Sequence, residues 1–303
     1  PNVEITIEKV LDGYPLLYHL ATRGYTSNTL AGRSNQRCHV YVPMFRETKD
    51  AASGDALIEM FASGMFLNSV QYTLPVEGPC TESITLVGNN RWWRIGNMSA
   101  IANNAQNFSL GQDVPLAYAL SSGGIQMREN VRFNTNSTSR DANGQVNFSS
   151  AADYATILPP DIAGISSSGT NLVKADGNYP AAIQSISVST NLNRDSLYEL
   201  GHKGAYFRPV SFPVEVTCDI EINSKSGDLV NVYENGVGTT GGNLTNRSIY
   251  ISLQDGTFLN LGTKNKLNNI SVGGGNAGGG IDTITYSYTT QNDLTVIHPQ
   301  DPG

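Results

Sequence analysis

Few side chains of this sequence have the type and spacing that catalysis requires. The four histidines stand far apart, and none lies in HExxH spacing or beside a cysteine nucleophile. No GxSxG elbow and no phosphate-binding loop occurs in the chain. The histidines are His19, His39, His202 and His298. The sequence therefore predicts no catalytic residue and a protein that is not an enzyme.

The cysteines, like the histidines, do not indicate a catalytic or metal site. Cys38, Cys80 and Cys218 are an odd and widely spaced set, with no CxxC and no Cys/His cluster. A disulfide framework or a zinc site needs closer and paired ligands. We expect three reduced, partly buried thiols, no bound metal and no cofactor.

Two further patterns have a chemical and a structural interpretation. The glycine-rich run 273–280 fits GxGxxG, but the residues that follow it alternate like a strand, whereas a dinucleotide site needs a helix there. We expect the tip of a hairpin instead. The pair Trp92 and Trp93 could stack on a sugar. Adjacent strand residues point to opposite faces, so we expect one of the two in the core.

Acidic side chains form the most regular polar pattern. Residues 210–222 alternate strictly, with apolar side chains at even positions and Glu215, Thr217, Asp219 and Glu221 on the other face. Paired carboxylates serve glycosidases when they converge. A stripe that faces solvent or an interface is the simpler interpretation, and we favour it.

Composition limits the classes of partner. The chain has 303 residues, a net charge of −7, a pI near 5.1 and only 15% charged residues. Nucleic-acid binders need clustered lysine and arginine, which this sequence lacks. No apolar stretch is long enough to span a membrane, and the first residues do not resemble a signal peptide. We expect a protein made in a cytoplasm, with no membrane partner.

Strands dominate the rest of the chain. Alternation at residues 3–7 predicts a strand, and 70–76 with 84–86 predicts a hairpin around Glu77–Cys80. Short strands follow near 249–261, 284–288 and 294–296. Apolar residues at i,i+4 with cap and stop signals predict short helices at 53–64 and 193–201. The fold class is mainly β.

An offset of 140 residues aligns twelve positions, for example Leu57 with Leu197 and Tyr72 with Phe212. This pattern favours an internal duplication. We therefore predict a first module at 1–96, a loop-rich insertion at 97–182 and a second module at 183–303.

Two segments resemble the tail tube proteins of tailed bacteriophages. They are SVQYTLPVEGPCTESITLVGNN (69–90) and the stretch Asn193 to Asp228, notably its parts ELGHKGAYFR (199–208) and FPVEVTC (212–218). Together they cover about a fifth of the chain. The resemblance implies β-sandwich or barrel-like modules whose long hairpins pair side by side in rings, which stack into a tube that conducts genome DNA.

The resemblance also implies partners and a place. A trimer with pseudo-sixfold symmetry or a hexamer would form each ring, in contact with sheath, baseplate and neck proteins of a virion tail. The inter-subunit pairing would use the hairpins at 69–87 and 210–223. Their apolar positions are Val70, Tyr72, Leu74, Val210, Phe212 and Val214.

The acidic face agrees with such a conduit, because a lumen that repels phosphates lets DNA slide. We expect Glu215, Thr217, Asp219 and Glu221 to face the lumen, and Lys203 and Arg208 to lie outside it at subunit contacts. Two alternatives remain: another phage structural protein (neck, baseplate or capsid), or a carbohydrate-binding β-protein.

Overall fold

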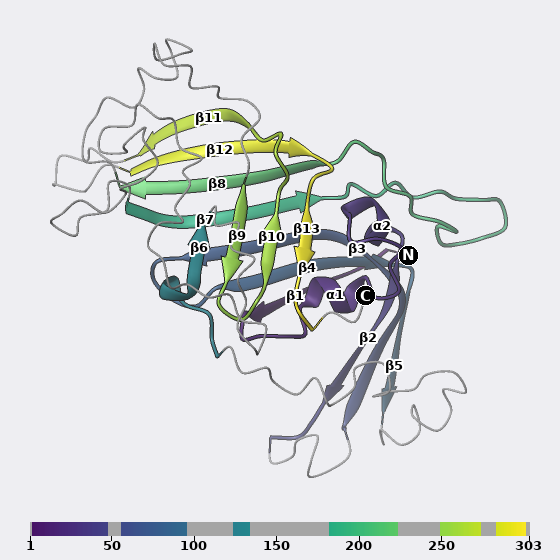
Figure 1. Ribbon diagram of the computed structural model, residues 1–303. Helices are drawn as coiled ribbons and strands as arrows, with labels where there is room; N and C mark the ends of the chain where they lie inside the picture. The colour runs from purple at the N-terminus through teal and green to yellow at the C-terminus, as the bar shows by residue number, and fades with distance from the viewer. Residues whose placement is uncertain are drawn as a thin grey trace, which may run out of the picture.

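The computed structural model describes residues 2–47, 56–95, 124–133, 182–223, 249–273 and 283–300. Within these ranges the chain is mainly β, as the sequence predicts, with two antiparallel sheets and short helices (Figure 1). The elements are β1 (Val3–Val10), α1 (Leu17–Ala21), α2 (Leu30–Ser34), β2 (Arg37–Met44), β3 (Ile58–Pro75), β4 (Thr81–Gly88), β5 (Asn90–Ile95), the 3-10 turn η2 (Arg128–Asn130), β6 (Val131–Phe133), β7 (Ala182–Asn191), β8 (Glu215–Asn223), β9 (Tyr250–Leu253), β10 (Phe258–Asn260), β11 (Lys266–Gly273), β12 (Thr283–Gln291) and β13 (Thr295–Ile297).

The large sheet contains strands from both ends of the sequence. Its main path is β1-β4-β3-β7-β8-β12-β11, and every neighbouring pair is antiparallel. The junction between the two halves is the β3–β7 pair, in register from Ser69 with Asn191 to Pro75 with Ser185. The halves that the sequence assigns to two modules therefore share one sheet.

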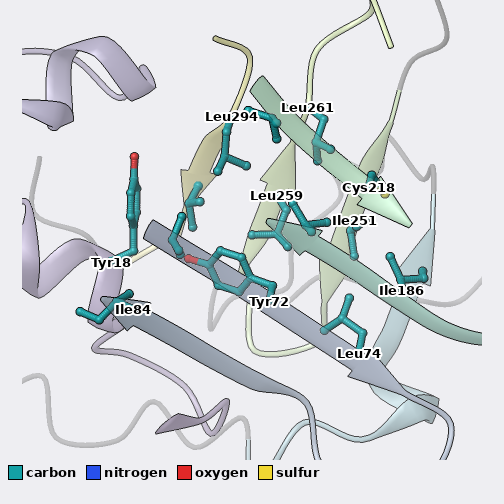
Figure 2. Close-up of a cluster of buried hydrophobic side chains, with 14 of the residues drawn as sticks. Tyr18, Tyr72, Leu74, Ile84, Ile186, Cys218, Ile251, Leu259, Leu261 and Leu294 are labelled. Atoms are coloured by element: carbon teal, nitrogen blue, oxygen red, sulfur yellow. The ribbon is translucent and has the colours of Figure 1, made fainter. Parts of the chain in front are cut away.

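The small sheet, in the order β13-β10-β9-β6, covers one face of the large sheet (Figure 1). Figure 2 shows Ile251, Leu259 and Leu261 of this layer beside Tyr72 and Ile186 of the large sheet. All five are at most 3% exposed. Burial of apolar side chains stabilises a fold by about 25 cal/mol per Å2, so this interlayer cluster holds the two sheets together.

A projecting arm extends the sheet beyond this core (Figure 1). The first half of the 18-residue strand β3 lies between β2 and β5, whereas its second half lies between β4 and β7. We call the three-stranded extension formed by 37–44, 58–66 and 90–95 the arm. A second projection is the loop 192–214 between β7 and β8, which we call the β7–β8 loop.

Neither predicted helix is present among the described residues. Residues 58–64 belong to β3, whose backbone pairs with β2 and β5 on its two sides. The i,i+4 spacing of Leu57 and Phe61 also fits a strand, in which residues four apart lie on the same face. The hydrogen-bonded neighbours on both sides show that residues 58–64 form a strand. In the second segment, the Leu197 N–H donates to Phe207 O at 3.0 Å, and the Tyr206 N–H donates to Leu197 O at 2.9 Å. These cross-loop bonds replace the helical ones.

The hairpins are confirmed, but the long strand is shorter than its pattern suggested. β3 and β4 pair with Val70 opposite Ile84, and β11 and β12 flank the glycine run with Gly273 opposite Thr283. The alternation after Val210 becomes a strand only at Glu215. Pro213 offers no N–H to a ladder, and Phe212 before it is 43% exposed.

The internal repeat is not shown by the structure. Tyr72 is fully buried in the second half of β3, whereas its proposed equivalent, Phe212, lies exposed in a loop. Leu57 precedes a strand, and Leu197 lies in a single bridge to Phe207. The shared spacing therefore does not reflect equivalent positions.

Candidate functional site

The face of the large sheet that points away from the small sheet is the most extensive surface feature of the described residues. We call it the polar face. Its side chains are all partly or fully exposed. They are Glu4, Thr6, Glu8, Ser69, Gln71, Thr73, Thr81, Ser83, Thr85, Ser185, Ser187, Ser189, Asn191, Glu215, Thr217, Asp219, Glu221, Lys266, Asn269, Ser271, Thr285, Ser287, Thr289 and Gln291.

The strand registers make this face continuous. One row of directly opposed residues crosses all seven strands of the main path, in the order Glu8, Ser83, Gln71, Ser189, Thr217, Thr289 and Lys266. Apolar residues with the same orientation lie at its margins, namely Val10, Pro75 and Val87. The polar face is therefore one surface shared by both halves of the chain.

Its charge is strongly biased. Among the residues of the polar face, five carry a carboxylate, and Lys266 on the outermost strand is the single base. Glu215, Asp219 and Glu221 lie along β8, and Glu4 and Glu8 lie along β1. Carboxylates on one face make a negative potential that repels phosphates at low ionic strength.

Hydrogen bonds between neighbouring strands occupy many of its polar groups. Ser189 Oγ lies 2.8 Å from Thr217 Oγ1, and the Ser185 hydroxyl donates to Glu221 Oε2 at 3.1 Å. Near β1, Thr6 Oγ1 lies 3.2 Å from Thr85 Oγ1. Because these side chains bond to one another, they are less available to bind a molecule that passes over the sheet.

The sequence found only part of this surface. Glu215, Thr217, Asp219 and Glu221 share one face, as predicted, while their position in a lumen stays a prediction. The hydroxyl-bearing residues of β7 and β12 were missed. A usable signal was present, since serine alternates at 185, 187 and 189.

The predicted inter-subunit hairpins need a correction. Both edges of β3 and of β8 are hydrogen-bonded within the chain. Val70, Tyr72, Leu74 and Val214 point into the core, at 4% exposure or less. Val210 is half-buried and bridges to Arg194. Strands that are paired on both sides leave no edge for a neighbouring subunit, so β3 and β8 do not offer a pairing surface.

Arg208 also differs from its expected place. It is 5% exposed, and it donates to Ser196 Oγ at 2.8 Å and to the amide oxygens of Asn2 and Asn89 at 3.0 Å. It therefore fastens the β7–β8 loop to the sheet and is buried within the chain. Lys203 is exposed, and its place at a subunit contact outside the lumen stays a prediction.

Arg194 fastens the same loop through a second set of hydrogen bonds. Its Nε donates to Leu67 O at 2.6 Å, and its terminal nitrogens donate to the carbonyls of Arg208 and Ser34. Burial and the nearby Arg208 lower the pKa of Arg194 to about 10. A pocket of about 220 Å3 at this junction is lined by Arg37, Phe66, Asn89 and Arg208, among others.

The arm corrects the interpretation of the tryptophans. Trp92 and Trp93 lie on opposite faces of β5, and both are exposed, at 60% and 52%. Trp92 neighbours Phe61, and Arg91 lies 5.4 Å from the Trp93 ring centroid. Because they face opposite ways, the two rings cannot line one sugar groove together.

The remaining candidates for chemistry are the cysteines and the potential metal ligands. None of the three cysteines forms a disulfide. Cys80 and Cys218 are buried and Cys38 is half-buried, in line with the predicted thiols. Burial raises the pKa of the Cys38 thiol to about 11, which keeps it protonated near neutral pH. Within the described ranges, no three His, Cys, Asp or Glu side chains gather as metal ligands. None of the helices there is long and apolar enough to span a membrane.

No family model and no curated protein sequence matches this chain.

Proposed function

We propose that this chain is a structural virion protein that assembles into stacked rings and forms the tail tube of a phage, through which genome DNA passes. The observation that carries the proposal is the polar face. It is a wide, continuous sheet surface with five carboxylates and a single lysine at its margin.

A conduit for DNA needs walls that do not hold the phosphate backbone. Each lysine or arginine that meets a phosphate releases counterions and adds affinity, and these contacts multiply along a stacked tube. Hydroxyls bonded to one another, with interspersed carboxylates, avoid this retention. The protein then makes and breaks no covalent bond, and its activity consists of assembly and passage.

The sequence resemblance supports the same role. The segment 69–90 forms the β3–β4 hairpin in the middle of the large sheet, and 212–218 leads into β8. The proposal includes a homo-oligomer in a virion tail, with sheath, baseplate and neck proteins as its neighbours. It involves no cofactor and no specific DNA contact.

The first test is assembly and DNA retention with purified protein. We expect negative-stain microscopy to show rings or tubes with a central bore, and we expect DNA to pass without binding. Replacing Glu215, Asp219 and Glu221 with lysine should leave the tubes intact but make them retain DNA. Retention should fall steeply as salt increases, because it depends on phosphate contacts.

A matched variant controls for net charge. Glu77, Glu199 and Asp293 are exposed acids outside the polar face, and their replacement with lysine changes the charge equally. This variant should not retain DNA inside tubes. Equal retention by both variants, or a strictly monomeric wild-type protein at high concentration, would refute the conduit. Closed rings that never stack would favour a neck, baseplate or capsid role.

A further inference from the structure

The main path of the large sheet ends in two strands that each pair with only one other described strand. β1 is hydrogen-bonded to β4 alone, and β11 is hydrogen-bonded to β12 alone. Both strands have eight residues, and neither contains proline. Natural sheets usually protect such edges with prolines, charges or covering loops, unless the edge serves to pair with another chain.

The core-facing side chains of these edge strands are incompletely covered. On β1, Val3, Ile5 and Ile7 are half-buried. On β11, Ile270 is half-buried and Val272 is 58% exposed, although both lie on the apolar side of the sheet. If the two edges met, these rows would pack against each other and lose their remaining exposure to water.

The charges on the polar face also match across such a seam. Lys266 opens β11, and its orientation is that of Glu4 and Glu8 on β1. A shift of four residues along the seam places Lys266 level with Glu4 and lets seven residues of β1 overlap with β11. In this register Thr6 lies level with Asn269. The one lysine of the polar face then lies beside a glutamate of the neighbouring copy.

Strand direction decides the symmetry. Seven consecutive antiparallel strands make the first and the last run the same way, so β1 and β11 are parallel. Copies related by a rotation that keeps the polar face inward would therefore join β1 of one copy to β11 of the next in parallel. A two-fold axis would instead join β1 of one copy to β1 of the other. Glu4 and Glu8 of each copy would then lie beside the glutamates of the other copy, with no lysine of the polar face between them.

We propose that the rings close head to tail through a parallel β1–β11 seam between copies of this chain. The seam continues the polar face around the inside of the ring. It names the interface of the tail tube proposed above and rests on that function only for the identity of what passes through the bore.

The strand count also sets the number of copies. Strands lie about 4.8 Å apart, and a stagger of four residues at each seam tilts them by about 20°, so three copies with 21 strands give a backbone diameter of about 34 Å. Side chains reduce the free bore to roughly 22 Å, which still admits a DNA duplex. Two copies leave roughly 11 Å, and six leave roughly 57 Å. Three copies form the smallest ring that a duplex can pass.

Cross-linking of single-cysteine variants tests the seam. Thr6→Cys and Asn269→Cys place thiols on the polar face of β1 and β11, in a Cys38→Ser background whose two other cysteines are buried. With a short bismaleimide, mixed T6C and N269C proteins should give a covalent dimer, whereas each alone should give none. The T6C/N269C double variant should give a ladder that stops at three copies. A Ser189→Cys variant mixed with N269C is the control, since Ser189 lies mid-sheet and should not react across copies.

Charge substitutions on β11 give a second measurement. Val272→Lys alters a side chain that is exposed in the single chain but buried in the seam, so we expect a folded monomer that no longer forms rings. Ser271→Lys, on the polar face of the same strand, should still assemble. A dimer from T6C alone would establish a β1–β1 seam and overturn the proposal, as would rings without any T6C–N269C product. A ladder that reaches six would overturn the copy number.

These outcomes separate the seam from the function. A three-copy ladder in rings that never form tubes would keep the seam and refute the tail tube. Tubes that pass DNA while the T6C–N269C mixture stays uncross-linked would keep the function and refute the seam.

Discussion

Single charged residues serve two different purposes in this molecule. The acids of the polar face are exposed and alternate with apolar side chains, so the sequence revealed those on β8. Glu82, Arg194 and Arg208 are buried or largely buried and fasten loops to the sheet. Each of them has partners 64 to 206 residues away in sequence, such as Tyr18 for Glu82 and Asn2 for Arg208. No local pattern reveals such pairs.

Glu82 attaches helix α1 to the sheet. Its carboxylate accepts hydrogen bonds from the Leu17 N–H at 2.6 Å, the Tyr18 N–H at 3.0 Å and the Tyr72 hydroxyl at 2.8 Å. Glu82→Gln turns one acceptor into an NH2 donor that faces a backbone N–H. We expect a loss of about 1–3 kcal/mol in the free energy of unfolding, measured by urea denaturation. An unchanged unfolding midpoint would show that α1 is held by packing alone.

The burial of Glu82 also predicts that the free energy of unfolding depends on pH. Burial raises the pKa of Glu82, and its three hydrogen bonds only partly oppose this rise. The folded chain therefore binds more protons than the unfolded chain between the ordinary glutamate pKa of about 4.3 and the raised value, and stability falls as the pH rises through this window. Glu82→Gln should remove this slope. Asp255, whose pKa burial also raises, keeps its own slope of the same sign in both proteins.

The hydrogen bonds of Arg194 predict that this residue keeps the β7–β8 loop ordered. Its planar guanidinium donates to three backbone carbonyls, which a single lysine ammonium cannot reach together. Arg194→Lys should cost about 1–3 kcal/mol and speed proteolysis within residues 195–207. Lys203→Arg, at an exposed position of the same loop, is the control. Equal cleavage rates in both variants would contradict the anchoring role.

At the scale of elements, periodicity identified strands well and helices poorly. Strands such as β1, β4, β8 and β12 alternate because one side packs on the core and the other meets solvent. The residues of the arm break this rule, since apolar side chains occur on both faces of β3. Their spacing then imitates a helix, and only the pairing with β2 and β5 resolves the ambiguity.

The arm also makes a spectroscopic prediction. Trp92 and Trp93 are the two tryptophans of the chain, so its tryptophan fluorescence comes from the arm alone. Both rings are more than half exposed. We expect long-wavelength emission that acrylamide quenches readily in the unassembled protein. Because the rings face opposite ways, Trp92→Phe and Trp93→Phe should each leave one reporter, and shielding of one on assembly identifies the covered face. Short-wavelength, unquenched emission from the single chain would contradict the exposed arm.

At the scale of the whole molecule, the two halves of the sequence depend on each other. β3 from the first half pairs with β7 from the second over seven residues. β6 likewise pairs with β9 across more than one hundred residues of sequence. Sequence periodicity indicates that strands exist, but it does not indicate which strands adjoin. This is why the mainly β class was predictable and the shared sheet was not.

This shared sheet predicts how a cut chain behaves. A protease site inserted between Phe133 and Ala182 separates the first half from the second covalently, yet the β3–β7 and β6–β9 ladders and the interlayer core still join the pieces. We expect the nicked protein to elute as one species on size exclusion and to separate only in denaturant. A site inserted between Asn223 and Ile249, which lies within the second half, serves as the matched cut. Fragments that part under native conditions after the first cut but not after the second would mean that the halves are independent modules, because a single hydrogen-bonded sheet cannot lose half of its strands and leave both parts folded.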